Sequence, residues 1–417
     1  MKSDIDALMQ ERNLDALLVI GAAEHNPPMY YFTGGGHISG AFLIKKRGEK
    51  PVLFCGDMER GEAEKTGLTV RLQGEYPMAD LMKEANGDMS MTVALRLHHM
   101  LRDLGLTKGR VGIYGVVEFG SVFAHIQKLQ AFLPELELVG EHGMNSIFTL
   151  AMETKDETEV ARIRRMGQVT TEVVRRVAEY LTSREVCTDE VLLKEDGSPL
   201  TIADIKSRID LWLAELGAEN PEGCIFAIGR DAGVPHSAGT PTDLLRLGQT
   251  IVFDIYPCEA GGGYFYDFTR TWSLGYATPE AQKLWNEVKV VYDKVAENFD
   301  LNAQFKDYNK LVCEEFEKNG YKTPMNTPAP TEGYVHSLGH GVGLNVHERP
   351  WSGLTATDDN ILKPGVIITS EPGLYYPEKG MGVRIEDTLW VRPDGKVEIL
   401  AEYPYDFVLK MKKWNKK

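Results

Sequence analysis

Apolar, strand-like segments that each carry an acidic residue are the feature that most limits what this chain can fold into. Residues 250–256 read as a buried strand interrupted by Asp254, and residues 264–272 read as an aromatic strand that contains Asp267. Alternate residues of a strand face the same side, so Asp254 shares a face with Val252. A buried charge is costly without a partner, and two carboxylates in adjacent buried strands repel each other unless a cation lies between them. The fold must bring these acids to a shared positive charge.

Two later segments repeat the pattern. Residues 366–373 form an apolar strand that ends in Glu371 and a Pro-Gly turn. Residues 382–390 read as one strand with Arg384, Glu386 and Thr388 on one face. Taken singly, each acid has a plainer explanation as a solvated residue or as half of a salt bridge. The recurrence of the pattern favours a common site.

Residues 336–348 are rich in histidine and glycine. His336 and His340 lie four residues apart, a spacing that suits a zinc-binding helix. Each glycine costs a helix about 1 kcal/mol relative to alanine, which argues against a helix here, and the segment contains Gly339, Gly341 and Gly343. A turn that brings the backbone close to a ligand fits this composition better.

The charges of these residues match those of two divalent cations, which leads to the hypothesis of a metal site. Two divalent cations carry four positive charges, and four carboxylates supply four negative ones, from Asp254, Asp267, Glu371 and Glu386. A neutral His340 completes the ligand set without adding charge. An oxygen-rich site with one imidazole accepts manganese, cobalt, iron or zinc, and we take manganese as the first candidate.

The chain divides into two parts by pattern. The first third alternates strand-like segments at 14–20, 40–44, 51–55, 110–116 and 135–139 with a helical segment at 120–133, which predicts an α/β domain. A long amphipathic helix follows a change of pattern at 144–156. We therefore expect an amino-terminal domain at 1–148 and a catalytic domain at 149–417. Within the second, a helix should start at Thr278-Pro279, and another should span 307–319.

Composition excludes several classes of function. The formal net charge of −15 disfavours nucleic acid and anionic membranes as partners. No run of 18 apolar residues is present, and acids near the start do not resemble a signal peptide. The five scattered cysteines read as reduced thiols. We expect a cytoplasmic protein.

With these motifs in place, the chain resembles the pita-bread metallopeptidases, which include aminopeptidase P, prolidase and the metal-free creatinase. All five ligand positions are filled in order, and the segment at 30–34 is similar to one in the creatinase-type amino-terminal domain. The resemblance implies an α/β amino-terminal domain followed by an α+β pita-bread catalytic domain. Asp254 and Asp267 are thirteen residues apart, where the family usually has eleven, and a lengthened hairpin at 257–263 accommodates the difference.

The resemblance also implies roles for individual residues. Two divalent metal ions activate water, and Glu371 moves a proton to the leaving proline nitrogen. His347 and His236 donate hydrogen bonds to the substrate carbonyl and the developing oxyanion. His336 lines the pocket for proline, and Arg384 clamps a substrate carboxylate. The expected activity is hydrolysis of the Xaa-Pro bond in dipeptides or short peptides that carry proline after the first residue.

Other readings remain open. A related hydrolase, either a general aminopeptidase or a creatinase-like enzyme, shares the fold, and so does a non-catalytic pita-bread binding module. We also expect a homodimer in which residues 30–36 reach towards the partner's active site. The alternative for that segment is a buried strand-turn within its own subunit.

Overall fold

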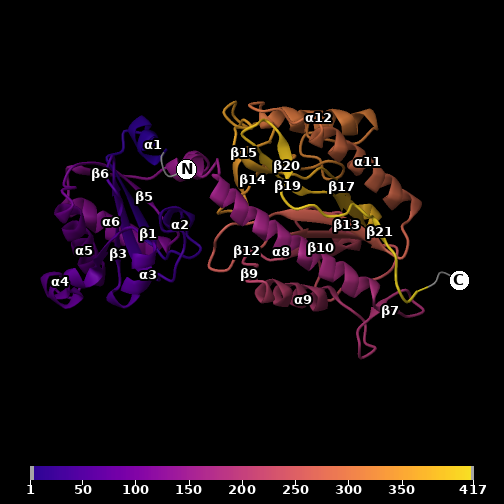
Figure 1. Ribbon diagram of the computed structural model, residues 1–417, viewed down its shortest axis with the longest axis horizontal. Helices are drawn as coiled ribbons and strands as arrows, with labels where there is room; N and C mark the ends of the chain where they lie inside the picture. The colour runs from indigo at the N-terminus through magenta and orange to yellow at the C-terminus, as the bar shows by residue number, and fades with distance from the viewer. Residues whose placement is uncertain (1–3, 415–417) are drawn as a thin grey trace. The chain divides into compact units, whose positions relative to one another are not determined.

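A mixed six-stranded sheet forms the centre of the first of two units in the computed structural model, which describes residues 4–414 (Figure 1). The strand order is β4-β3-β2-β1-β5-β6, with β1 antiparallel to β2 and parallel to β5. The first four residues of β1 are fully buried, as expected for a strand covered on both faces. The strands are β1 Ala16–Gly21, β2 Ala41–Lys46, β3 Val52–Cys55, β4 Thr69–Leu72, β5 Gly109–Tyr114 and β6 Leu136–Val139.

Helices complete this α/β unit. The two longest, α5 and α6, pack against each other, and their apolar residues share a core with the sheet. The five predicted strands and the helix near 120–133 are confirmed, whereas β4 and α5 were not predicted. The helices are α1 Ile5–Glu11, α2 Pro27–Thr33, α3 Arg60–Lys65, α4 Met78–Glu84, α5 Met89–Asp103, α6 Phe119–Phe132 and α7 Ile147–Ala151, with short 3-10 turns at Asp57–Glu59, Gln73–Glu75 and Gly143–Asn145.

Residues 30–36 do not form the buried strand-turn that is one of the two forms expected for them, and their approach to a partner's active site stays a prediction. The aromatic half lies in helix α2, which Pro27 helps to start and which Gly34 ends in the left-handed conformation (φ 72°). Tyr31 and Phe32 are buried, and both rings pack edge-on against Phe148. The aromatic residues thus stabilise their own unit, and exposed glycine begins only at Gly34.

The second unit is built on a long helix, α8. Its N-terminus is a capping box in which Asp156 and Glu159 satisfy each other's backbone N–H groups. Thr278 caps α11 as predicted, and its hydroxyl accepts from the backbone N–H of Ala281. The helices are α8 Glu157–Thr182, α9 Ile202–Glu215, α10 Gly229–Ala232, α11 Pro279–Ala296 and α12 Phe305–Lys318, with a 3-10 turn at Pro377–Lys379.

Two sheets of this unit carry the acidic segments. One has the order β10-β11-β13-β21 and the other β15-β14-β16-β19-β20. Their strands are β10 Cys224–Ile228, β11 Thr250–Ile255, β13 Phe268–Leu274, β14 His340–Gly341, β15 Glu348–Trp351, β16 Ile367–Ser370, β19 Asp387–Val391, β20 Val397–Ile399 and β21 Val408–Leu409. Three two-stranded pairs add β7 Glu185–Val186, β8 Leu192–Leu193, β9 Ala218–Glu219, β12 Cys258–Glu259, β17 Gly373–Tyr376 and β18 Met381–Arg384.

The single strand expected over residues 382–390 is wrong. The chain leaves β18 after Arg384 and enters β19 at Asp387, so it passes from one sheet to another. At the crossing, the Glu386 N–H donates to the Thr269 carbonyl at 3.1 Å. This hydrogen bond to β13 takes the place of continued strand pairing, so Glu386 lies in the break between β18 and β19.

Asp267 also lies outside the strand predicted for it. The preceding residues bond elsewhere, since the Phe265 N–H donates to the Gly343 carbonyl and the Tyr266 N–H donates to the Pro257 carbonyl. Strand β13 therefore begins only at Phe268.

The two units part between Met152 and Glu153, and residues 261–263 group with the first. The boundary expected at residue 148 falls inside α7 and stays a prediction. Across the described chain, no helix combines the length and apolar character needed to cross a membrane.

Candidate metal centre

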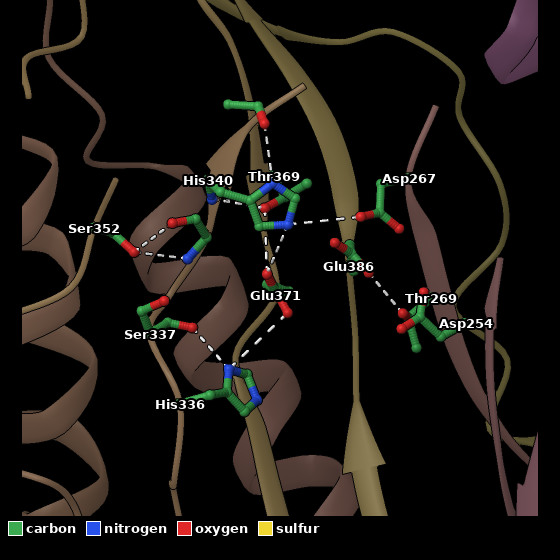
Figure 2. A network of polar contacts seen from close by, with 12 residues as sticks. Asp254, Asp267, Thr269, His336, Ser337, His340, Ser352, Thr369, Glu371 and Glu386 are labelled. Atoms are coloured by element: carbon green, nitrogen blue, oxygen red, sulfur yellow. Dashed lines mark hydrogen bonds and ion pairs between the residues drawn. The ribbon is translucent and has the colours of Figure 1, made fainter. Parts of the chain in front are cut away.

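The five predicted ligands come together in the second unit (Figure 2). His340 Nε2 lies 3.6 Å from Asp267 Oδ2 and 3.4 Å from Glu371 Oε1. One ligand atom from each of Asp267, His340 and Glu386 falls within 4.8 Å of the others. Asp254 lies on the far side of Glu386, next to Thr269.

Strand register explains this convergence. Asp254 of β11 pairs with Thr269 of β13, and Thr269 forms a bridge with Glu386. The Thr269 hydroxyl donates to Glu386 Oε2 at 2.6 Å. Residues far apart in the chain are therefore held in one layer by backbone pairing.

The glycine-rich turn places His340. It is not helical, as predicted, and a Cβ on Gly341 would lie 1.9 Å from the Arg349 carbonyl oxygen. His340 Nδ1 lies 3.0 Å from the Gly341 carbonyl oxygen, an acceptor only, so Nδ1 carries the proton. The lone pair of Nε2 then points at Asp267 and Glu371, the arrangement of a metal-binding imidazole.

The acids repel one another in the absence of a cation. Burial raises the pKa of Asp267 and Glu386 well above the ordinary range, and neighbouring carboxylates raise it further. Burial likewise raises the pKa of Glu371 to about 8, although Arg384 opposes the shift. Burial lowers the pKa of His340 to about 3, so its ring is neutral.

The cluster fits divalent cations. Three buried carboxylate oxygens have no hydrogen-bond partner among the described residues: Asp254 Oδ1, Asp267 Oδ1 and Glu386 Oε1. Buried polar atoms are normally satisfied, so three such oxygens around one space indicate that positive charge belongs there. Oxygen donors with one imidazole suit hard divalent ions.

Arg384 is held by the protein. It forms an ion pair with Asp254, and its remaining contacts are with Thr269 Oγ1, Tyr375 Oη and the Pro235 carbonyl. A guanidinium has five N–H donors, and four are occupied. The expected role of clamping a substrate carboxylate stays a prediction that rests on the remaining donor.

A cavity of about 470 Å³ opens onto these residues and is also lined by His236, His336 and His347. His336 contacts Tyr375 Oη at 2.8 Å through Nε2, and burial lowers its pKa to about 3. Burial also lowers the pKa of His347, whose ring stacks on Trp351. All five predicted ligands and all predicted catalytic residues therefore face one space.

The sequence did not reveal an ion pair behind the histidine turn. Lys155 Nζ lies 2.7 Å from Glu348 Oε2, and the two side chains are 1% and 2% exposed. Glu348 also accepts from the Asn345 backbone N–H at 3.1 Å. The pair therefore fixes the residue that follows His347.

A second missed group surrounds Asp387. Its carboxylate accepts from Arg270 at 2.9 Å and from the hydroxyls of Tyr292 and Tyr405. Arg270 also donates to the Glu386 carbonyl at 2.8 Å. This network holds the crossing where Glu386 lies. In the sequence, Arg270 and Asp387 each stand close to a candidate ligand, but no local pattern pairs them.

Comparisons with known proteins identify the family of this chain. The model of metallopeptidase family M24 matches residues 161–393. A Xaa-Pro dipeptidase from Pyrococcus horikoshii is 24% identical over 391 residues, 93% of each chain. An uncharacterized peptidase from Staphylococcus aureus is 26% identical over 385 residues, covering 90% of this chain and 92% of that one.

Solved structures share the whole fold. A Xaa-Pro dipeptidase from Bacillus anthracis superposes with a TM-score of 0.73 at 18% identity, covering 98% of this chain and 99% of that one. An X-Pro aminopeptidase from Thermotoga maritima gives 0.72 at 21% identity, covering 95% and 99%. The expected pita-bread architecture with an α/β amino-terminal domain is confirmed. The chain belongs to metallopeptidase family M24.

Proposed function

We propose that this chain is a dinuclear metal-dependent peptidase that hydrolyses the Xaa-Pro bond of dipeptides or short peptides. The observation that carries the proposal is the set of unpartnered, buried carboxylate oxygens around His340. Its support on substrate comes from the dipeptidase relative, which is similar over 93% of both chains.

Five residues would hold the ions: Asp254, Asp267, His340, Glu371 and Glu386. When bound, two divalent ions polarise a carbonyl and lower the pKa of water towards neutrality. Manganese is the ion that we propose to test first, followed by cobalt, iron and zinc.

In the reaction, a water oxygen bonds to the scissile carbonyl carbon, the bond to the proline nitrogen breaks, and that nitrogen gains a proton. Glu371 takes the proton from the attacking water and gives it to the nitrogen. His236 and His347 donate hydrogen bonds to the carbonyl oxygen as its negative charge grows. His336, fixed by Tyr375, forms a wall of the pocket for the proline ring.

Metal content and substrate choice test the proposal together. Chelation should abolish activity, added metal should restore it, and elemental analysis of the restored enzyme should find two ions per chain. Paired substrates that differ only in proline or alanine at the second position should be cleaved only when proline is present. Fully active protein without bound metal, or equal cleavage of both substrates, would contradict the proposal.

We also propose a cytoplasmic homodimer. All five cysteines are free thiols, as a reducing compartment would keep them. Exposed Gly34, Gly36 and His37 follow α2 and supply a surface for a second copy. Light scattering at assay concentration should give twice the chain mass, and a fully active monomer would end the dimer proposal.

A further inference from the structure

A fifth carboxylate lines the cavity beside the four proposed ligands. Glu222 lies on the turn just ahead of β10 and is exposed, so it stands at the opening of the cavity. No cation or hydrogen-bond donor within residues 4–414 pairs with its side chain. Asp254, by contrast, is matched by Arg384. Glu222 therefore offers a negative charge that the protein does not use.

The space around Glu222 combines charge with apolar surface. Glu222 and His347 line the same cavity. Ile225, Val346 and Trp351 line the cavity as well. Long basic side chains pack their methylene stems on apolar surface and keep the charged head near water. The lining thus suits a substrate side chain that is apolar along its length and cationic at its end.

On the basis of the proposed Xaa-Pro activity, we propose that Glu222 selects peptides with lysine or arginine immediately before the proline. The substrate's α-amino nitrogen is bonded to the carbon next to the scissile carbonyl, so it stays near the buried ligands. An acid at the opening matches a charge further from the reacting bond. Lysine and arginine carry theirs at the end of a flexible stem of three or four methylenes.

The decisive comparison is arginine against citrulline, a neutral residue of nearly the same shape. We would measure kcat/KM for Arg-Pro and citrulline-Pro, as dipeptides and as tripeptides ending in alanine. The metal-loaded enzyme should favour arginine by about two- to fivefold, the range for an ion pair that stays in contact with water. The preference should shrink as salt is added.

Three variants sharpen the test. E222Q should bring the arginine-to-citrulline ratio close to one, and E222K should favour Glu-Pro over Gln-Pro. E378Q is the matched control, because Glu378 is exposed outside the cavity, and its ratio should equal that of the unaltered enzyme.

Each contrary result has a distinct meaning. A ratio near one in the unaltered enzyme, or a ratio that survives in E222Q, overturns the role of Glu222. Equal weakening by E222Q of every peptide with a free amino terminus would assign the acid to the α-ammonium group and overturn the side-chain preference. Cleavage of Xaa-Ala peptides without cleavage of any Xaa-Pro peptide would instead overturn the proposed activity.

Discussion

Two adjacent acids, Glu386 and Asp387, differ in how completely the surrounding protein satisfies their carboxylate oxygens. Asp387 is completely buried, and both its oxygens accept from Arg270, Tyr292 or Tyr405. Glu386 is equally buried, yet its Oε1 has no partner in the described chain. The protein supplies every partner for one acid and leaves the other open.

The difference separates a structural charge from a functional one. A buried ion pair with complete hydrogen bonding is a fixed support, and removing one member is strongly destabilising. A buried acid with an oxygen that no protein group satisfies is destabilising in itself, so it indicates a place where a cation binds. Because Arg270 holds the Glu386 backbone while leaving its side chain open, the support serves the site directly.

The largest effect should come from breaking the support. R270M leaves Asp387 without its cation, and we expect a loss of about 3–5 kcal/mol in unfolding free energy. E386Q is the matched change at the acid with an unpartnered oxygen. In metal-free protein it should not lower stability, since it removes one of several carboxylates that repel one another. Urea unfolding of both variants measures the contrast. Equal destabilisation by the two substitutions would contradict the division into a structural acid and a functional acid.

A second prediction sharpens the comparison inside the cavity. H347A and H236A should lower kcat by about 10²-fold, because each removes a donor to the developing oxyanion, while both ions stay bound. H340A should lower metal content, because His340 faces the acids. Turnover measured beside elemental analysis separates the two kinds of histidine. Loss of metal in H347A with full metal in H340A would reverse the assignments.

The smallest effect concerns pH and metal-free protein. Glu371 has a pKa of about 8 when folded and an ordinary value of 4.5, so near pH 7 the folded form holds a proton that the unfolded form has lost. The stability of the metal-free protein should therefore fall as pH rises from 7 to 9, and Glu371 alone contributes about 1 kcal/mol of the loss. Asp267 and Glu386, whose pKa values are also raised, act in the same direction. Unfolded histidines, with an ordinary pKa of about 6.5, are mostly neutral at pH 7 and lose their remaining protons early in this window, so they oppose the fall only weakly. Metal-loaded protein should lack the slope, and a rise in metal-free stability over this range would contradict it.

The acids of the candidate metal centre could be predicted from the sequence because each one interrupts an apolar segment. Asp254 and Glu371 stand out in this way without any structure. The α/β unit and the capped helices were readable for similar reasons of local pattern and turn chemistry. Local signals thus predicted the candidate ligands and most of the helices and strands near them.

The buried ion pairs that support the site could not be predicted from the sequence. Arg270 and Asp387 are 117 positions apart, and Lys155 and Glu348 are 193 apart. Pairing over such separations depends on tertiary packing, which no local pattern encodes. The break at Glu386 has the same origin, because a bond to Thr269 overrides a segment that alternates like a continuous strand.

The Lys155–Glu348 pair has a consequence for dividing this enzyme by proteolysis or truncation. A chain shortened to start at α8 would keep every proposed metal ligand but would lose Lys155 and leave Glu348 buried without its cation. Glu153, two residues earlier, pairs with Lys363 and would be lost as well. Such a fragment should contain all the proposed ligand residues, but the turn that carries His347 should lose its rigidity. A catalytic fragment that functions must therefore begin ahead of Glu153, before the first turn of its leading helix.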